Sequence, residues 1–145
     1  MTYFNWAPEL DTGISVIDNQ HKRIVEYINT LDKAVREKDM SVVAEVVEQL
    51  TDYTVTHFTF EEELMQKHGY PYLDAHKKVH QAFTERVQNY KKRIDQGEDV
   101  SRQLLSDLRI WLTNHIKRDD KDYVEICNKV DHSWVSRAVN RLFGT

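Results

Sequence analysis

Histidine is concentrated in one part of this 145-residue chain, because residues 57–80 hold four of its seven histidines. His76 and His80 are four residues apart, and His57 stands four residues before Glu61. On an α-helix this spacing places both members of a pair on one face, where they could bind the same metal ion. Imidazole binds transition metals and also serves in acid–base catalysis, so each pair indicates a possible site without defining its chemistry.

Either pair alone is weak evidence, because such a pair on a helix is more often a surface contact or a hydrogen-bonded core histidine than a ligand set. Two further histidines change this balance. His21 falls at helical spacing from the apolar Ile24, and His115 lies beside Trp111 in another apolar stretch. Five imidazoles that converge in an apolar interior would be costly to desolvate without a metal ion. The pattern therefore favours a metal site.

Asp120 is the difficult member of the candidate set. It follows His115 by five residues, which turns its side chain about 140° away on a regular helix. Both side chains face the interior only if the helix loosens there, by a π-bulge or a fraying turn. The alternative is that Asp120 belongs to the solvated run KRDDKD, and the sequence leaves both interpretations open.

The composition indicates which elements position these side chains. Four glycines and two prolines leave little material for the turns of a sandwich or barrel, so we expect one all-α domain over residues 1–145. Apolar residues at helical spacing predict four long helices after an irregular N-terminal arm. Their expected limits are Ser15 to about Glu37, Ser41 to Gly69, about Tyr72 to Gln96, and Asp99 or Ser101 to beyond His115.

Helix ends carry recognisable capping residues. Ser15 and Asp18 resemble a capping box, and Ser41 is a plausible N-cap of the second helix. Gly69 and Gly97 suit the left-handed conformation that ends a helix. The turns between these helices must therefore be short.

Four helices of similar length with short connections predict an antiparallel up-down-up-down bundle. Because the chain direction alternates, all five candidate histidines would lie toward the same end of that bundle. The final segment HSWVSRAVNRLFGT is amphipathic and predicts a short C-terminal helix. We expect it to cover one end of the core, and a partner-binding tail is the alternative.

Charge and hydropathy exclude several classes of protein. The net charge is -4 with both signs interspersed, so neither nucleic acid nor anionic lipid is an expected partner. Charges interrupt every apolar run, and the opening MTYFNWAPELD lacks the features of a signal peptide. We expect a cytoplasmic monomer without a membrane span, in which the single cysteine, Cys127, is a small buried side chain.

Together the motifs resemble the hemerythrins of the bacterial, single-domain kind. The matching stretches are WAPELDTGISVIDNQH, HFTFE, HKKVH and HIKRDD, within about residues 6–123. The resemblance implies two non-heme iron ions joined by an oxo or hydroxo bridge. The implied ligands of one iron are His76, His80 and His115, those of the other are His21 and His57, and Glu61 and Asp120 bridge both.

The function implied by this resemblance is reversible binding of O₂, for transport, storage or delivery to an oxygen-consuming enzyme. The implied ligands leave one coordination position open, on the iron with two histidines. Apolar walls would keep water and protons away from bound O₂ and so keep its binding reversible. By their offset from the ligands, the candidate wall residues are Ile24, Trp111, Leu112 and Ile116.

Three alternatives remain beside O₂ binding. A di-iron oxidase, peroxidase or reductase is disfavoured because the paired Glu-x-x-His motifs of carboxylate-rich bundles are absent from this sequence. A sensor of O₂, NO or redox state would have only the tail from about Asp131 to carry its output. Incidental histidines or a zinc site would have to explain seven matching positions. We therefore expect a binding protein rather than an enzyme, in which His68, Glu62 and Glu63 are not ligands but ordinary helix-end and surface side chains.

Overall fold

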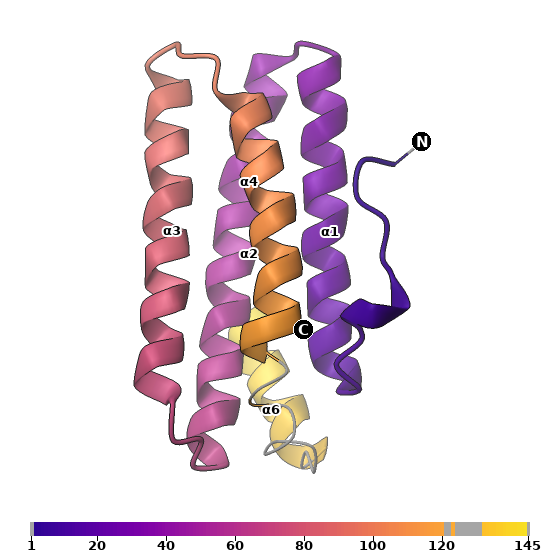
Figure 1. The fold of residues 1–145 in the computed structure, drawn as a ribbon, viewed down its shortest axis with the longest axis vertical. Coiled ribbons are helices and arrows are strands. Elements are labelled where there is room, and N and C mark those ends of the chain that lie inside the picture. The colour runs from indigo at the N-terminus through magenta and orange to yellow at the C-terminus, as the bar shows by residue number, and fades with distance from the viewer. Residues whose placement is uncertain (1, 121–122, 124–131, 145) are drawn as a thin grey trace.

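The computed structural model describes residues 2–120, 123 and 132–144, with the backbone alone at residues 119, 120 and 132. Within these residues, four long helices pack side by side along one axis (Figure 1), as the sequence predicts. Among the same residues, one short helix precedes these four and two elements follow them. The elements are η1 (Pro8–Leu10), α1 (Ser15–Arg36), α2 (Met40–Lys67), α3 (Leu73–Asp95), α4 (Ser101–Asn114), η2 (His115–Asp120) and α6 (His132–Phe143).

Short turns reverse the chain between successive helices, so that α1 to α4 run alternately up and down (Figure 1). Gly69 ends α2 with a φ of 67°, and Gly97 ends α3 with a φ of 89°. Only glycine adopts this left-handed conformation without steric cost, which is why both turns fall where the sequence predicts them. At the first of them the Tyr70 amide donates to the carbonyl of Met65, at 2.9 Å.

The start of α1 differs from the predicted capping box. Its N-cap is Ile14, which has no capping side chain, and Ser15 is already the first helical residue. Asp18 accepts instead from both the backbone N–H and the hydroxyl of Thr12, at 2.8 and 2.7 Å. The carboxylate therefore ties the N-terminal arm to α1 rather than pairing with Ser15.

Two further capping expectations are wrong, that Ser41 caps α2 and that Asp99 or Ser101 caps α4. α2 begins one residue earlier than expected, and its N-cap Asp39 accepts from the Val42 amide at 3.3 Å. At α4 the N-cap is Val100, and no side chain caps the helix. In each turn the serine hydroxyl donates to the aspartate two residues before it, Ser41 to Asp39 and Ser101 to Asp99, because a carboxylate is a strong acceptor.

The apolar core consists of two clusters. The larger one joins α1 to α4 along most of the bundle. The smaller one lies around the first residues of α1 and the last turns of α2, and it includes Phe60, Leu64, Tyr70 and Tyr123. Side chains of α6 pack onto this second cluster, so the predicted C-terminal helix covers one end of the core.

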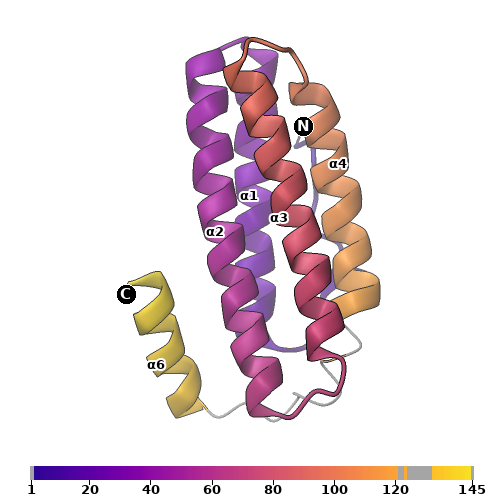
Figure 2. The ribbon, with the colours of Figure 1, turned by 90° about the vertical axis from the view of Figure 1, so that its left-hand side faces the viewer.

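α6 reaches this cluster from the side, along α2 (Figure 2). The ring of Trp134 lies 5.7 Å from that of Phe60, measured between centroids. An ion pair of 2.5 Å between Arg141 and Glu63 fixes the next turns of the same helix. α6 thus covers a face of α2 that adjoins the face lining the bundle interior.

No helix in the described ranges is both long enough and apolar enough to cross a lipid bilayer.

Replacement of Trp134 by alanine should lower the free energy of unfolding by about 1–2 kcal/mol, a fraction of the roughly 3–5 kcal/mol that truncation of a fully buried tryptophan costs. The loss follows from the partly buried indole that packs on Phe60. Denaturant unfolding of the two proteins measures the difference. Ser136→Ala, at an exposed position of the same helix, is the control. Equal midpoints for all three proteins would contradict the packing of α6 on α2.

Candidate metal centre

A cluster of imidazoles surrounds Glu61 at the end of the bundle where α1 begins and α2 ends. Glu61 itself has no exposed surface, and each of the histidines around it is at most 5% exposed. They come from α1, α2, α3 and the first position of η2, as the alternating chain direction predicts. The members are His21, His57, His76, His80 and His115.

The donor atoms of this cluster fall into two groups that share Glu61. One group contains Glu61, His76, His80 and His115, and the other contains Glu61, His21 and His57. Within each group the donor atoms lie within 4.8 Å of one another. Neutral imidazole nitrogens with carboxylate oxygens suit first-row transition metals, so the residues present fit a pair of such ions bridged by one carboxylate.

Both oxygens of Glu61 face polar atoms. Its Oε1 lies 3.0 Å from Nε2 of His57 and 3.5 Å from Nε2 of His80. Its Oε2 accepts a hydrogen bond of 2.5 Å from the hydroxyl of Tyr123. The carboxylate is therefore held at the centre of the cluster from several directions.

Burial and the neighbouring polar groups shift the pKa values of Glu61 and His80 in opposite directions. Burial alone would raise the pKa of Glu61, but the charge of His57 and hydrogen bonds from the imidazoles hold that pKa well below its ordinary value. For His80, burial lowers the pKa, and hydrogen bonds to Glu61 and Glu62 outweigh this and raise it. The site therefore favours an ionised carboxylate at its centre.

Two polar side chains contact the imidazoles of His57 and His80 on the ring nitrogen that points away from Glu61. Nδ1 of His57 lies 2.5 Å from Oε1 of Gln20, and Nδ1 of His80 lies 2.8 Å from Oε2 of Glu62. Each contact occupies one ring nitrogen and leaves Nε2 directed at Glu61. Metal-binding histidines commonly have such a partner, which fixes the tautomer and raises the basicity of the ligating nitrogen.

The prediction that Glu62 is an ordinary surface acid is therefore wrong. Its side chain is 24% exposed, and its carboxylate reaches across to His80 on α3. Sequence spacing also missed Gln20, because only the packing of α1 on α2 brings it to His57. Glu63 does lie on the outer side, where it pairs with Arg141. His68 lies at the C-cap of α2, outside both donor groups, as predicted.

η2 is the element that the candidate Asp120 requires. Residues His115–Asp120 form a π-helix, in which the wider turn brings residues five apart toward the same face. This is one of the two distortions that the spacing of His115 and Asp120 predicts. The side chain of Asp120 lies outside the described residues.

The four candidate wall residues all belong to the larger core cluster or pack against it. Ile24, Leu112 and Ile116 are buried in the larger core cluster, and Trp111 is partly buried there and stacks on His115 with ring centroids 4.4 Å apart. A further aromatic contact was not predicted, since Phe58 stacks on His80 at 3.8 Å. Helical spacing places Phe58 beside His57, and only the packing of α2 on α3 brings it to His80.

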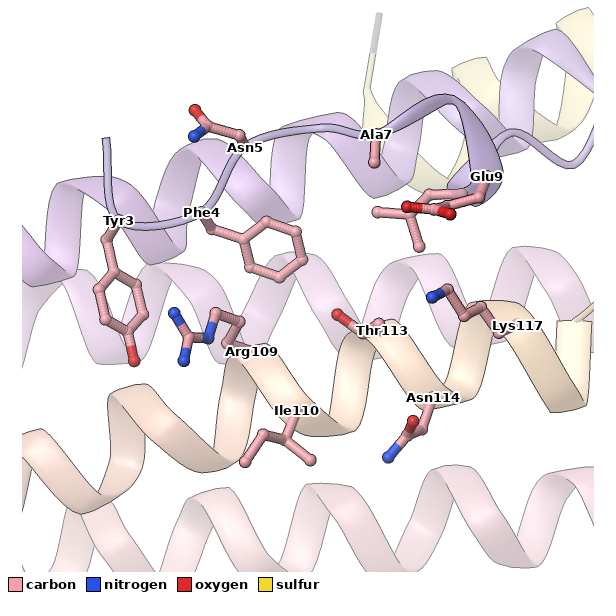
Figure 3. A pocket seen from close by; sticks show the side chains of 11 residues that line it. Tyr3, Phe4, Asn5, Ala7, Glu9, Arg109, Ile110, Thr113, Asn114 and Lys117 are labelled. Atoms are coloured by element: carbon pink, nitrogen blue, oxygen red, sulfur yellow. The ribbon is translucent and has the colours of Figure 1, made fainter. Parts of the chain in front are cut away.

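A separate groove lies between the N-terminal arm and α4 (Figure 3). Its volume is about 380 Å³, and its lining includes Tyr3, Ile110 and Lys117. The guanidinium of Arg109 lies over the ring of Tyr3, 4.7 Å from the centroid. None of the clustered histidines lines this groove, so it is distinct from the candidate metal centre.

Comparison with known families agrees with this geometry. Residues 12–127 match the family described as the hemerythrin HHE cation binding domain. The chain belongs to the hemerythrin family. The matched residues contain both donor groups. The resemblance inferred from the sequence motifs is thereby confirmed, and the cluster around Glu61 lies within the matched domain.

Relatives within the hemerythrin family cover nearly the whole chain. It is 46% identical to a bacteriohemerythrin of Pseudomonas paraeruginosa, over 99% of this chain and 100% of that one. It is 34% identical to a bacteriohemerythrin of Methylococcus capsulatus, over 85% and 95% of the two chains. A wild-type hemerythrin crystal structure superposes with a TM-score of 0.83 at 31% identity, over 88% of this chain and 99% of that one.

Glu62→Ala should weaken metal binding by about 10–100-fold, because His80 loses the acceptor that orients its ring. Glu63→Ala is the matched control, since its carboxylate lies one residue away and binds only Arg141 among the described contacts. Loss of bound metal to a competing chelator, followed at equal protein concentration, compares the two variants with the parent chain. If both variants lose the metal at the same rate, Glu62 does not orient His80.

Proposed function

We propose that the two donor groups hold a pair of iron ions and that the chain binds O₂ reversibly at this pair. The observation that carries the proposal is the sharing of one fully buried carboxylate, Glu61, by two sets of buried imidazoles. When bound, a ferrous pair would supply two electrons and an open coordination position for O₂. The curated relatives named bacteriohemerythrin and myohemerythrin support this choice of function.

The proposed ligands follow the two groups. His76, His80 and His115 would bind one iron, His21 and His57 the other, and Glu61 would bridge them. Asp120 is proposed as the second bridging carboxylate, because the π-helical turn of η2 brings its backbone to the face that carries His115. The ion with only two histidines would keep the open position, beside α1 and α2.

The surrounding side chains have two tasks in this proposal. Gln20 and Glu62 hold the rings of His57 and His80 so that Nε2 points inward. Buried Ile24, Leu112 and Ile116 exclude water, and Trp111 covers His115 from the same side. Without water nearby, protons reach bound O₂ slowly, and release of O₂ competes favourably with its reduction.

The histidine-rich donor set favours binding over oxidation. Bundles that activate O₂ surround their metal ions with several carboxylates from paired Glu-x-x-His motifs. Here each donor group of the described residues contains one carboxylate, Glu61, and imidazoles otherwise. We infer a carrier or store of O₂, which could also deliver it to an oxygen-consuming enzyme.

Aerobically purified protein should contain about two irons per chain and show the visible absorption of a bridged ferric pair. After reduction without air, the protein should bind O₂ and release it again under vacuum. Absorption spectroscopy with metal analysis follows both steps. Colourless protein that holds zinc would overturn the proposed function.

His57→Ala should abolish O₂ binding, because it removes a donor from the group that already has the fewest imidazoles. His68→Ala is the matched control, since His68 stands on the same helix outside both groups. Oxygen titration of each reduced variant at equal iron content measures the difference. Unchanged O₂ binding by His57→Ala, or a loss of equal size in His68→Ala, would contradict the assignment.

A further inference from the structure

A row of aromatic rings leads from the candidate metal centre to the surface. The ring of Tyr123 lies 5.5 Å from His76, and that of Tyr70 lies 6.2 Å from Tyr123, measured between centroids. Tyr72 continues the row, 5.8 Å from Tyr70. All three contacts are edge-to-face and fall within the range of directly packed aromatic pairs.

Exposure increases step by step along this row. Tyr123 has no exposed surface, Tyr70 is 7% exposed and Tyr72 is 67% exposed. At the inner end the Tyr123 hydroxyl donates to Glu61, the carboxylate that both donor groups share. At the outer end Tyr72 is among the exposed large hydrophobic side chains of the described residues. The row therefore joins the interior of the site to solvent at the turn between α2 and α3.

We propose that Tyr123, Tyr70 and Tyr72 form a path that carries single electrons between the metal centre and the surface. This inference rests on the proposed iron pair. Electron tunnelling slows steeply with distance, so short steps between packed rings transfer an electron faster than one long step through aliphatic side chains. Tyrosine can also lose an electron itself if its phenol proton has an acceptor, and water around Tyr72 provides one.

An O₂-binding centre has a use for such a path. Some bound O₂ is released in reduced form, with electrons taken from the iron pair. The oxidised pair must then regain two electrons before it binds O₂ again. Two encounters with a reduced one-electron donor, such as a flavoprotein or an iron–sulfur protein, would supply them. Each donor would lose one electron at the surface near Tyr72, and each ferric ion would gain one.

The other aromatic contact of the site lacks these features. Trp111 stacks on His115 at 4.4 Å, and Phe83 stacks on Trp111 at 3.6 Å. Phenylalanine is hard to oxidise, and Phe83 is buried in the larger core cluster. That row therefore ends at a buried ring that is hard to oxidise, whereas the tyrosine row ends at the exposed Tyr72. Trp111 is still the natural competitor in an experiment.

The path can be tested by oxidising the metal centre with peroxide and looking for oxidation of Tyr72 at the surface. Iron-loaded protein in the ferric state is treated with hydrogen peroxide and the soluble phenol tyramine. Each peroxide takes two electrons and two protons and becomes two waters. One electron and one proton come from Tyr72 and one of each from tyramine, and the two phenoxyl radicals join through a carbon–carbon bond. Peptide mass spectrometry then locates the tyramine, which is a covalent readout independent of O₂ binding.

We expect tyramine on Tyr72 in iron-loaded protein and its loss in zinc-loaded protein, where the metal cannot exchange electrons. Tyr70→Phe should also lose this modification while keeping the same iron content, because the ring remains but its oxidisable phenol is gone. Tyr90→Phe is the control, since Tyr90 binds Asp107 between α3 and α4, away from the row. It should keep the modification on Tyr72.

Three results would overturn the path. These are an iron-loaded chain without tyramine on Tyr72, a modification at Trp111 in its place, or an unchanged modification of Tyr72 in Tyr70→Phe. Metal analysis before the reaction distinguishes a failure of the electron path from a failure of the proposed iron binding. A chain that takes up no iron overturns both, whereas a chain with its iron but without the modification overturns the path alone.

Discussion

The burial of Glu61 is the constraint on which the rest of the structure depends. A carboxylate removed from water loses solvation worth several kcal/mol, which only nearby positive charge and hydrogen bonds can restore. Imidazoles from α1, α2, α3 and η2 and the hydroxyl of Tyr123 supply these contacts. These groups come from different parts of the chain, so they meet at Glu61 only when the helices pack in this register. Two metal ions bridged by Glu61 would complete that compensation.

Helix packing also determines how the ligands are oriented. Gln20 reaches His57 across the α1–α2 interface, and Glu62 reaches His80 across the α2–α3 interface. A small shift of either helix would turn an imidazole, so the apolar clusters that fix the helices also contribute to metal affinity. α2 participates most directly, because one face carries His57 and Glu61 while α6 packs on the adjoining face, which carries Phe60.

Sequence spacing predicted the features that depend on the geometry of a single helix or of its end. The pairs His57 with Glu61 and His76 with His80 follow from the helical repeat, and Gly69 and Gly97 mark turns because of their backbone conformation. The five-residue spacing before Asp120 even predicts a local distortion, which η2 provides. Contacts between helices could not be predicted in this way.

The errors have the same origin. Glu62 resembles a surface acid in the sequence until α3 places His80 beside it. Asp18 accepts from Thr12 of the N-terminal arm rather than pairing with Ser15. Ser41 has the expected type for an N-cap, but Asp39, two residues before it, caps α2 and accepts the Ser41 hydroxyl.

In the proposed site one buried carboxylate, Glu61, joins two metal ions. Anomalous diffraction at the iron absorption edge, from crystals of iron-loaded protein, tests this arrangement. We expect two iron peaks, one beside His76, His80 and His115 and one beside His21 and His57, with Glu61 in contact with both. A single peak, or iron bound elsewhere than at Glu61, would contradict it.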